Sequence, residues 1–129
     1  LIQNEVAMHE KLFAGREGGS PLLVRLCDVL YEPARATLVL ELCEHREQLY
    51  EHIDSSPQGR LPEAAAAPIA RQLAAALAFM HSKRVAHLDV KPENILVASH
   101  ESRSPTPRLK LVDYGSACAM ELADGLVQE

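Results

Sequence analysis

Four polar side chains in the second half of the chain have the types and spacing that phosphate chemistry requires. Asp89, Lys91 and Asn94 lie close together, and Asp113 follows a segment rich in Ser and Pro. Carboxylate and amide oxygens are the ligands that Mg²⁺ prefers, so Asn94 and Asp113 are candidate metal ligands. Asp89 is then left to accept a proton from a hydroxyl group, and Lys91 can stabilise charge on a phosphoryl group in transfer.

Short apolar segments on either side must hold these residues in place. Residues 85–86 and 95–97 flank the polar stretch 87–94, and residues 109–112 are predicted to return as a strand after a surface tip at 99–108. Because a hairpin brings its two ends together, we expect Asn94 and Asp113 to face one site.

Three helices are predicted from apolar residues that recur at helical spacing, over residues 1–14, 48–53 and 62–82. In the third helix, Pro62 is expected to occupy the first turn, where its missing N–H costs nothing. Pro68 lies inside the helical pattern and should remove one hydrogen bond, which predicts a delayed start or a kink.

Two further strands are predicted between the first two helices. Residues 22–30 alternate in part between apolar and polar side chains, and residues 32–35 are expected to form a hairpin turn. Residues 37–42 are nearly all apolar, so this second strand is predicted to be buried on both faces.

Composition and charge restrict the classes of partner. The net charge of −5 gives no sign of a basic face, so we expect no nucleic-acid partner. Cys27, Cys43 and Cys118 are odd in number and far apart, which favours reduced, buried thiols in a cytoplasmic or nuclear protein. No apolar run approaches the ~18 residues of a membrane span, so none is predicted.

The motifs, taken in order, resemble those of the eukaryotic protein kinases. Residues 87–89 (His-Leu-Asp) are similar to the HRD motif of the catalytic loop, residues 91–94 (Lys-Pro-Glu-Asn) complete it, and residues 113–115 (Asp-Tyr-Gly) are similar to DFG. Lys91 resembles the lysine of the serine/threonine type. The His-Leu-Asp form resembles the calmodulin-dependent group, and within it the death-associated-type and the Trio/kalirin and obscurin-like kinases.

The resemblance implies an α+β, protein-kinase-like fold that is present in part: helix C, the last two strands of the small lobe, the hinge, helices D and E, the catalytic loop, the two strands that follow it and the DFG-type turn. A single partial kinase domain would then cover residues 1–129. Residues 1–42 would be the end of the small lobe and the hinge, with Leu40 as gatekeeper, and residues 43–129 the start of the large lobe.

The resemblance also implies ATP and Mg²⁺ as cofactors. On helix C, Glu5 would pair with a lysine of the small lobe, and the hinge would offer backbone groups of Glu41 and Cys43 to adenine. Leu96 would pack under the adenine ring, and the backbone of Glu93 would lie near the ribose. Residues 1–129 contain neither a Gly-rich loop nor the lysine that belongs with it, so these residues by themselves are expected to be inactive while the parent protein is active.

Three residues depart from the pattern of the family. Leu88 replaces an Arg that normally binds a phosphorylated activation loop, so we expect activity that does not depend on phosphorylation through this residue. Tyr114 replaces Phe and adds a hydroxyl that needs a partner. His9 stands where helix C usually has an apolar residue.

The leading function is therefore Mg·ATP-dependent transfer of the γ-phosphate to Ser or Thr of a protein substrate. One alternative is a pseudokinase-like or truncated module that binds partners without catalysis. Another is a small-molecule phosphotransferase, a class that shares the H-x-D-x-x-x-x-N pattern but usually lacks the residues found here at 91–94 and 113–115.

Overall fold

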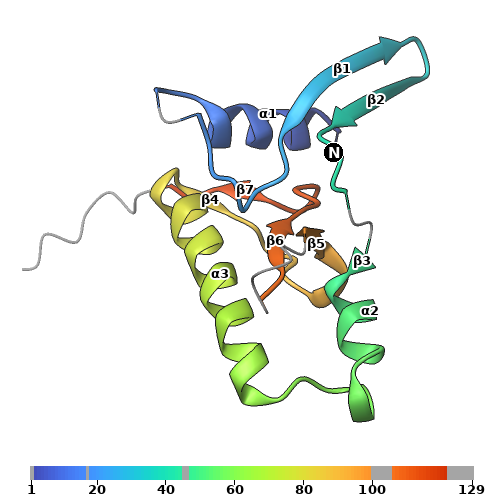
Figure 1. Ribbon diagram of the computed structural model, residues 1–129. Helices are drawn as coiled ribbons and strands as arrows, with labels where there is room; N and C mark the ends of the chain where they lie inside the picture. The colour runs from blue at the N-terminus through green and yellow to red at the C-terminus, as the bar shows by residue number, and fades with distance from the viewer. Residues whose placement is uncertain (1, 17, 45–46, 100–105, 122–129) are drawn as a thin grey trace, which may run out of the picture.

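The computed structural model describes residues 2–16, 18–44, 47–99 and 106–121. This part of the chain forms both helices and strands (Figure 1). In chain order they are α1 (Ile2–Phe13), β1 (Leu26–Glu32), β2 (Arg35–Leu40), β3 (Glu47–Gln48), α2 (Leu49–Asp54), the 3₁₀ turn η1 (Pro57–Gly59), α3 (Glu63–Ser82), β4 (Val85–Ala86), the 3₁₀ turn η2 (Pro92–Asn94), β5 (Ile95–Ser99), β6 (Arg108–Leu111) and β7 (Cys118–Ala119).

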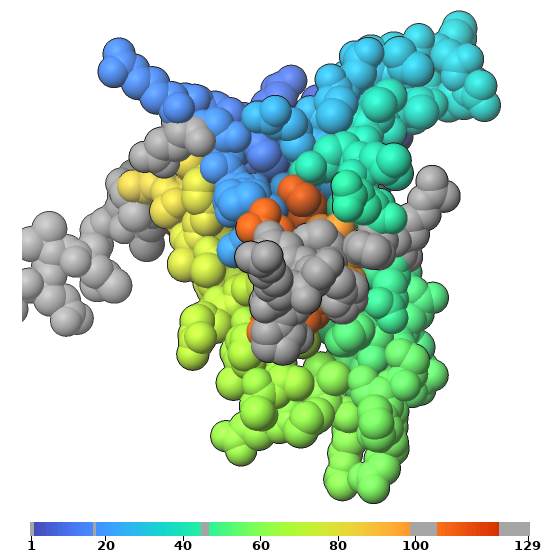
Figure 2. All heavy atoms as spheres, in the orientation of Figure 1, coloured from blue at the N-terminus to red at the C-terminus, as the bar shows by residue number. Residues whose placement is uncertain are grey.

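Strands β1 and β2 form an antiparallel hairpin that projects from the body of the molecule (Figures 1 and 2). Glu32 pairs with Arg35, which confirms the predicted turn, but β1 begins at Leu26 rather than at residue 22. The burial predicted for the second strand is wrong, because Val39 and Leu40 are each 39% exposed. A two-stranded ribbon with its neighbours on one side cannot cover both of its faces.

The centre of the structure is an antiparallel sheet in the order β3-β5-β6. Ile95 pairs with Leu111 and Val97 with Leu109, and all four side chains are buried. Alternate residues of a strand share one face, so this register makes a continuous apolar surface. The predicted strands are confirmed, although residues 100–105 of the expected tip lie outside the described residues.

Helix α3 lies against one side of this sheet and α2 against the other (Figure 1). The start of α3 is not delayed, because the helix begins at Glu63 and runs through Pro68 to Ser82. Pro62 is the N-cap and stands just before the first turn. Ile69 and Met80 are buried, which confirms that the predicted stripe faces the core.

Strands β4 and β7 pair in a short ladder that α1 contacts, so this helix lies over the segment that leads from residue 113 to β7 (Figure 1). The N-terminal part is joined to the central sheet by a parallel bridge between Leu23 and Leu111. Leu12, Leu23 and Tyr114 are fully buried at this junction. The core is thus continuous from α1 to the central sheet.

Two of the three cysteines differ from the expectation of burial. Cys43 is buried, whereas Cys27 and Cys118 are exposed, and all three are free thiols. Among the residues that the structure describes, no helix has the length and apolar character needed to cross a membrane.

Candidate functional site

The loop between β4 and η2 is anchored by a buried histidine. His87 is 2% exposed, and its Nε2 donates to the carbonyl oxygen of Val112 at 2.9 Å. Its Nδ1 accepts a hydrogen bond from the backbone N–H of Asp89 at 3.1 Å. Because a carbonyl can only accept, the two bonds select the neutral ring with hydrogen on Nε2. His87 thereby ties the start of the polar loop to the end of β6.

Three of the predicted catalytic residues form one cluster in this loop. The side-chain amide of Asn94 donates to the Asp89 backbone carbonyl at 2.9 Å and to Asp89 Oδ2 at 3.0 Å. The Lys91 Nζ lies 3.4 Å from the same carboxylate oxygen. Asn94 is buried on η2, whereas Asp89 and Lys91 are reached by solvent. Two donors therefore fix the Asp89 carboxylate and leave Oδ1 to a hydroxyl group.

The residue before Asp113 is bonded directly to this cluster. The Val112 N–H donates to the Asn94 carbonyl at 2.9 Å, so the chain enters Asp113 beside η2. Asp113 has a left-handed backbone with φ of 60°, a conformation that Asp adopts more readily than most residues. Its Oδ1 accepts from the Gly115 N–H at 3.1 Å, and a Cβ at position 115 would also lie 3.1 Å from that oxygen.

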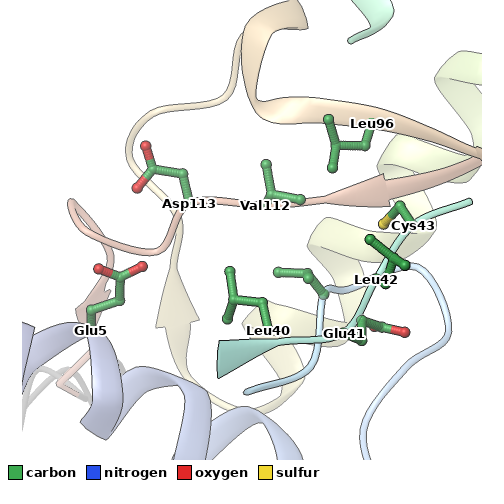
Figure 3. Close-up of a pocket in the computed structure, with 9 residues that line it drawn as sticks. Glu5, Leu40, Glu41, Leu42, Cys43, Leu96, Val112 and Asp113 are labelled. Atoms are coloured by element: carbon green, nitrogen blue, oxygen red, sulfur yellow. The ribbon is translucent and has the colours of Figure 1, made fainter. Parts of the chain in front are cut away.

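A pocket of about 410 Å³ opens beside Asp113, which is a volume suited to a small ligand. Asp113 and Glu5 lie at one end of it and Cys43 at the other (Figure 3). Apolar side chains fill most of the wall between the two ends. The lining residues are Glu5, Val24, Leu40, Glu41, Leu42, Cys43, Leu96, Val112 and Asp113.

The end of the pocket with two carboxylates favours a cation. Burial raises the pKa of Glu5, and the nearby charge of Asp113 raises it further. None of the lining residues in the described ranges is basic. A metal ion or an ammonium group at this end would relieve the repulsion between the two carboxylates.

At the opposite end, the Glu41 side chain points to a lysine and not to a ligand. Its Oε1 accepts from Lys110 Nζ at 2.8 Å and from the Arg25 N–H at 2.9 Å, and the Glu41 N–H donates to the Arg25 carbonyl. The Glu41 carbonyl and the Cys43 N–H make no backbone hydrogen bond with another described residue. Burial raises the pKa of the Cys43 thiol, as does the negative charge of Glu41.

The sequence model of the family described as "Protein kinase domain" matches residues 1–127 of this chain. The chain belongs to the protein kinase family. It is 33% identical over 127 residues (98% of this chain) to a calcium and calcium/calmodulin-dependent serine/threonine-protein kinase of Lilium longiflorum. Over 120 residues (91% of this chain) it is 32% identical to MAP kinase-activated protein kinase 2 of Drosophila melanogaster. Over 116 residues (90% of this chain) it is 37% identical to serine/threonine-protein kinase D2 of Rattus norvegicus.

These relatives confirm the predicted likeness to serine/threonine kinases and to calmodulin-dependent ones, while the likeness to death-associated and Trio-type kinases stays a prediction. The chain spans 23% of the length of the Lilium kinase, 33% of the Drosophila kinase and 12% of the rat kinase. The partial α+β kinase fold predicted from the motifs is also confirmed.

Four of the five residues that the kinase resemblance assigned to the nucleotide line the pocket: Glu5, Glu41, Cys43 and Leu96. The fifth, Glu93, lies exposed on η2 and is not among the lining residues. Sequence reasoning missed Val24 and Val112. Val112 could have been identified because it directly precedes Asp113 in the sequence. Val24 could not, because it lies in a segment that was predicted to be a strand and carries no motif.

Leu88, the residue in the place of the kinase arginine, is 68% exposed. Its φ of 65° lies in the left-handed region, where a branched side chain is disfavoured. Because its side chain is uncharged, Leu88 cannot bind a phosphate group through charge at this point of the catalytic loop.

Proposed function

We propose that the full-length protein that contains this chain is a protein serine/threonine kinase that uses Mg·ATP. The observation that carries this proposal is the hydrogen-bonded cluster of Asp89, Lys91 and Asn94, joined through Val112 to Asp113 at the wall of a pocket of nucleotide size. Four side chains with distinct chemical roles thus belong to one site. The serine/threonine preference is supported by the names of two of these relatives, the Lilium and the rat kinase.

The apolar part of the pocket is proposed to hold adenine. Leu40, Val24 and Leu96 line the pocket and offer the flat base an apolar surface. The Glu41 carbonyl and the Cys43 N–H supply one acceptor and one donor for the edge of the base. Glu93 retains its proposed role through its backbone, near the ribose.

The donor set fits a magnesium ion. The Asn94 amide N–H groups are taken up by Asp89, which leaves Asn94 Oδ1 as a neutral oxygen ligand. Asp113 Oδ1 accepts one backbone N–H, and its Oδ2 makes no hydrogen bond with another described residue. Hard oxygen atoms of this kind are the ligands of Mg²⁺. When bound, the ion would neutralise negative charge on the phosphates.

The chain's own residues would then handle the proton and the charge. The Asp89 carboxylate, held through Oδ2, would take the proton from a substrate hydroxyl. The hydroxyl oxygen would bond to the γ-phosphorus of ATP as the bond from that phosphorus to the bridging oxygen breaks and ADP leaves. The Lys91 ammonium would stabilise charge on the transferred group. Glu5, on α1, would pair with the small-lobe lysine that the kinase resemblance implies, since none of the described residues that line the pocket is a lysine.

We also propose a boundary between lobes near the hinge, with residues 1–42 in the small lobe and residues 43–129 in the large lobe. The hairpin that projects from the body of the molecule supports this division. A cytoplasmic or nuclear location is proposed from the three free thiols. The acidic net charge supports protein substrates rather than nucleic acid.

The test is transfer of labelled γ-phosphate from Mg·ATP to a protein substrate by the full-length protein, followed by analysis of the phosphorylated amino acids. We expect phosphoserine or phosphothreonine, and we expect none when residues 1–129 are expressed alone. Full-length protein that binds nucleotide but never transfers phosphate would contradict the proposal and favour a non-catalytic binding module. Phosphate on tyrosine alone would contradict the substrate class.

A further inference from the structure

The hydroxyl that distinguishes Tyr114 from phenylalanine has a specific partner. Tyr114 is fully buried, and its hydroxyl donates to the Val24 carbonyl at 3.0 Å, with the Leu111 carbonyl 3.3 Å away. Burial raises the pKa of this phenol, so the hydroxyl stays a donor. Val24 is itself buried, and its carbonyl makes no backbone hydrogen bond with the other described residues. Tyr114 therefore satisfies an acceptor that water does not reach.

Two histidines hold the Tyr114 ring. The His9 ring from α1 packs on it with centroids 4.4 Å apart, and the His87 ring meets it edge-on at 6.0 Å. His9 is 2% exposed, and its Nδ1 is the unpartnered buried side-chain atom found among the described residues. A ring confined in this way keeps the hydroxyl beside the Val24 and Leu111 carbonyls.

Helix α1 fixes the same segment at a second point. The Asn4 side-chain amide donates to the Ala117 carbonyl at 2.8 Å. Asp113 is exposed and has a left-handed backbone, and it lies between anchored neighbours, because Val112 is bonded to Asn94 and Tyr114 to Val24. Moving Asp113 away from the pocket would thus require the Tyr114 ring to leave its place and the Val24 carbonyl to lose its buried donor.

We propose that Tyr114 is a positioning residue whose hydroxyl, bonded to the Val24 carbonyl, holds Asp113 at the wall of the nucleotide pocket. The bond joins the Asp-Tyr-Gly turn to the segment before β1, and both segments contribute residues to the lining of the pocket. Its consequence for metal binding rests on the proposed function, in which Asp113 is a ligand of Mg²⁺. The restraint on the segment itself does not depend on that function.

The first measurement is amide hydrogen exchange over residues 113–117 in the full-length protein without nucleotide. Tyr114→Phe keeps the ring and removes only the hydroxyl. We expect exchange in this segment to become about tenfold faster, with exchange in α3 unchanged, since one buried hydrogen bond is lost. The matched control is Tyr31→Phe, which removes a hydroxyl from a side chain that is 69% exposed. Equal exchange in Tyr114→Phe and wild type would overturn the proposal.

The second measurement compares two ligands on the same variants. Adenosine tests the apolar part of the pocket, whereas Mg·ATP also needs Asp113. For Tyr114→Phe we expect Mg·ATP affinity to fall by about tenfold and adenosine affinity to change by less than about twofold. An equal loss for both ligands would overturn the positioning role. A wild-type protein that binds no Mg·ATP would refute the proposed function instead, while the exchange result would still decide the role of Tyr114.

Discussion

At the scale of single residues, His9 carries the buried side-chain nitrogen that has no hydrogen-bond partner among the described residues. A histidine with an unpartnered nitrogen occupies a buried position on α1 where the core would accept an apolar side chain. Burial lowers its pKa to about 4, because the charged ring would lose its hydration. The ring is therefore neutral in the folded protein, and its contact with Tyr114 is that of two packed rings.

His9 gives the folded state a specific dependence on pH. The ordinary pKa of histidine, 6.5, applies in the unfolded chain, whereas the pKa of His9 is about 4 in the folded protein. Between these two pH values the unfolded chain therefore binds a proton that the folded chain does not. Stability should fall as pH decreases from about 6.5 towards 4, by roughly 2 kcal/mol between about pH 7 and pH 5. The free energy of unfolding of the full-length protein, measured against pH, should show that the His9→Leu variant lacks this part of the loss of stability. Identical pH profiles for variant and wild type would contradict the burial of a neutral ring.

At the scale of elements, an ion pair joins the hinge to the central sheet. Glu41 follows β2, Lys110 lies on β6, and their side chains are 30% and 15% exposed. The same carboxylate accepts the Arg25 N–H, so it links three segments that are distant in sequence. A pair with this degree of burial stabilises more than a surface pair, because solvent screens it less.

Removal of the lysine should reveal this link. Lys110→Met keeps most of the side-chain length and leaves the Glu41 carboxylate without its cation. We expect the free energy of unfolding in urea to fall by roughly 1–2 kcal/mol. The matched control is Arg35→Met in the exposed ion pair of Arg35 with Glu32, where we expect no measurable change. Equal effects of the two substitutions would show that the Glu41–Lys110 link does not stabilise the fold.

The elements with a clear apolar pattern could be predicted from sequence, and the two-residue strands β3 and β7 could not. Helices α1 and α3 have enough residues for helical periodicity to show, and β5 and β6 consist of apolar segments beside the motifs. Strands β3 and β7 have two residues each, too few for any pattern, and they form because a partner strand is near. The motifs identified Asp89, Lys91 and Asn94, which the structure brings into one cluster, and their catalytic roles stay predictions. Val24 enters the pocket through a tertiary contact that periodicity does not encode.

At the scale of the whole molecule, the pocket lies where the hairpin meets the central sheet. Leu40 is the last residue of β2 in the hairpin, while Leu96 lies on β5 of the central sheet, and both line the pocket (Figure 3). The prediction that the second strand is buried on both faces failed because of the arrangement of the whole molecule. Its apolar residues signal burial, but burial depends on what covers the strand, and the described residues leave Val39 and Leu40 partly exposed.

The central claim is that the Asp89 cluster carries out phosphoryl transfer. The most direct test is the rate of phosphate transfer by the full-length protein at saturating Mg·ATP, with Asp89→Asn compared with wild type. The asparagine keeps the shape of the side chain and cannot accept the proton, so we predict a fall in kcat of about 10²-fold or more, with nucleotide affinity retained. The control is Asp54→Asn at the exposed end of α2, which should leave kcat unchanged. An Asp89→Asn protein that transfers phosphate at the wild-type rate would contradict the account.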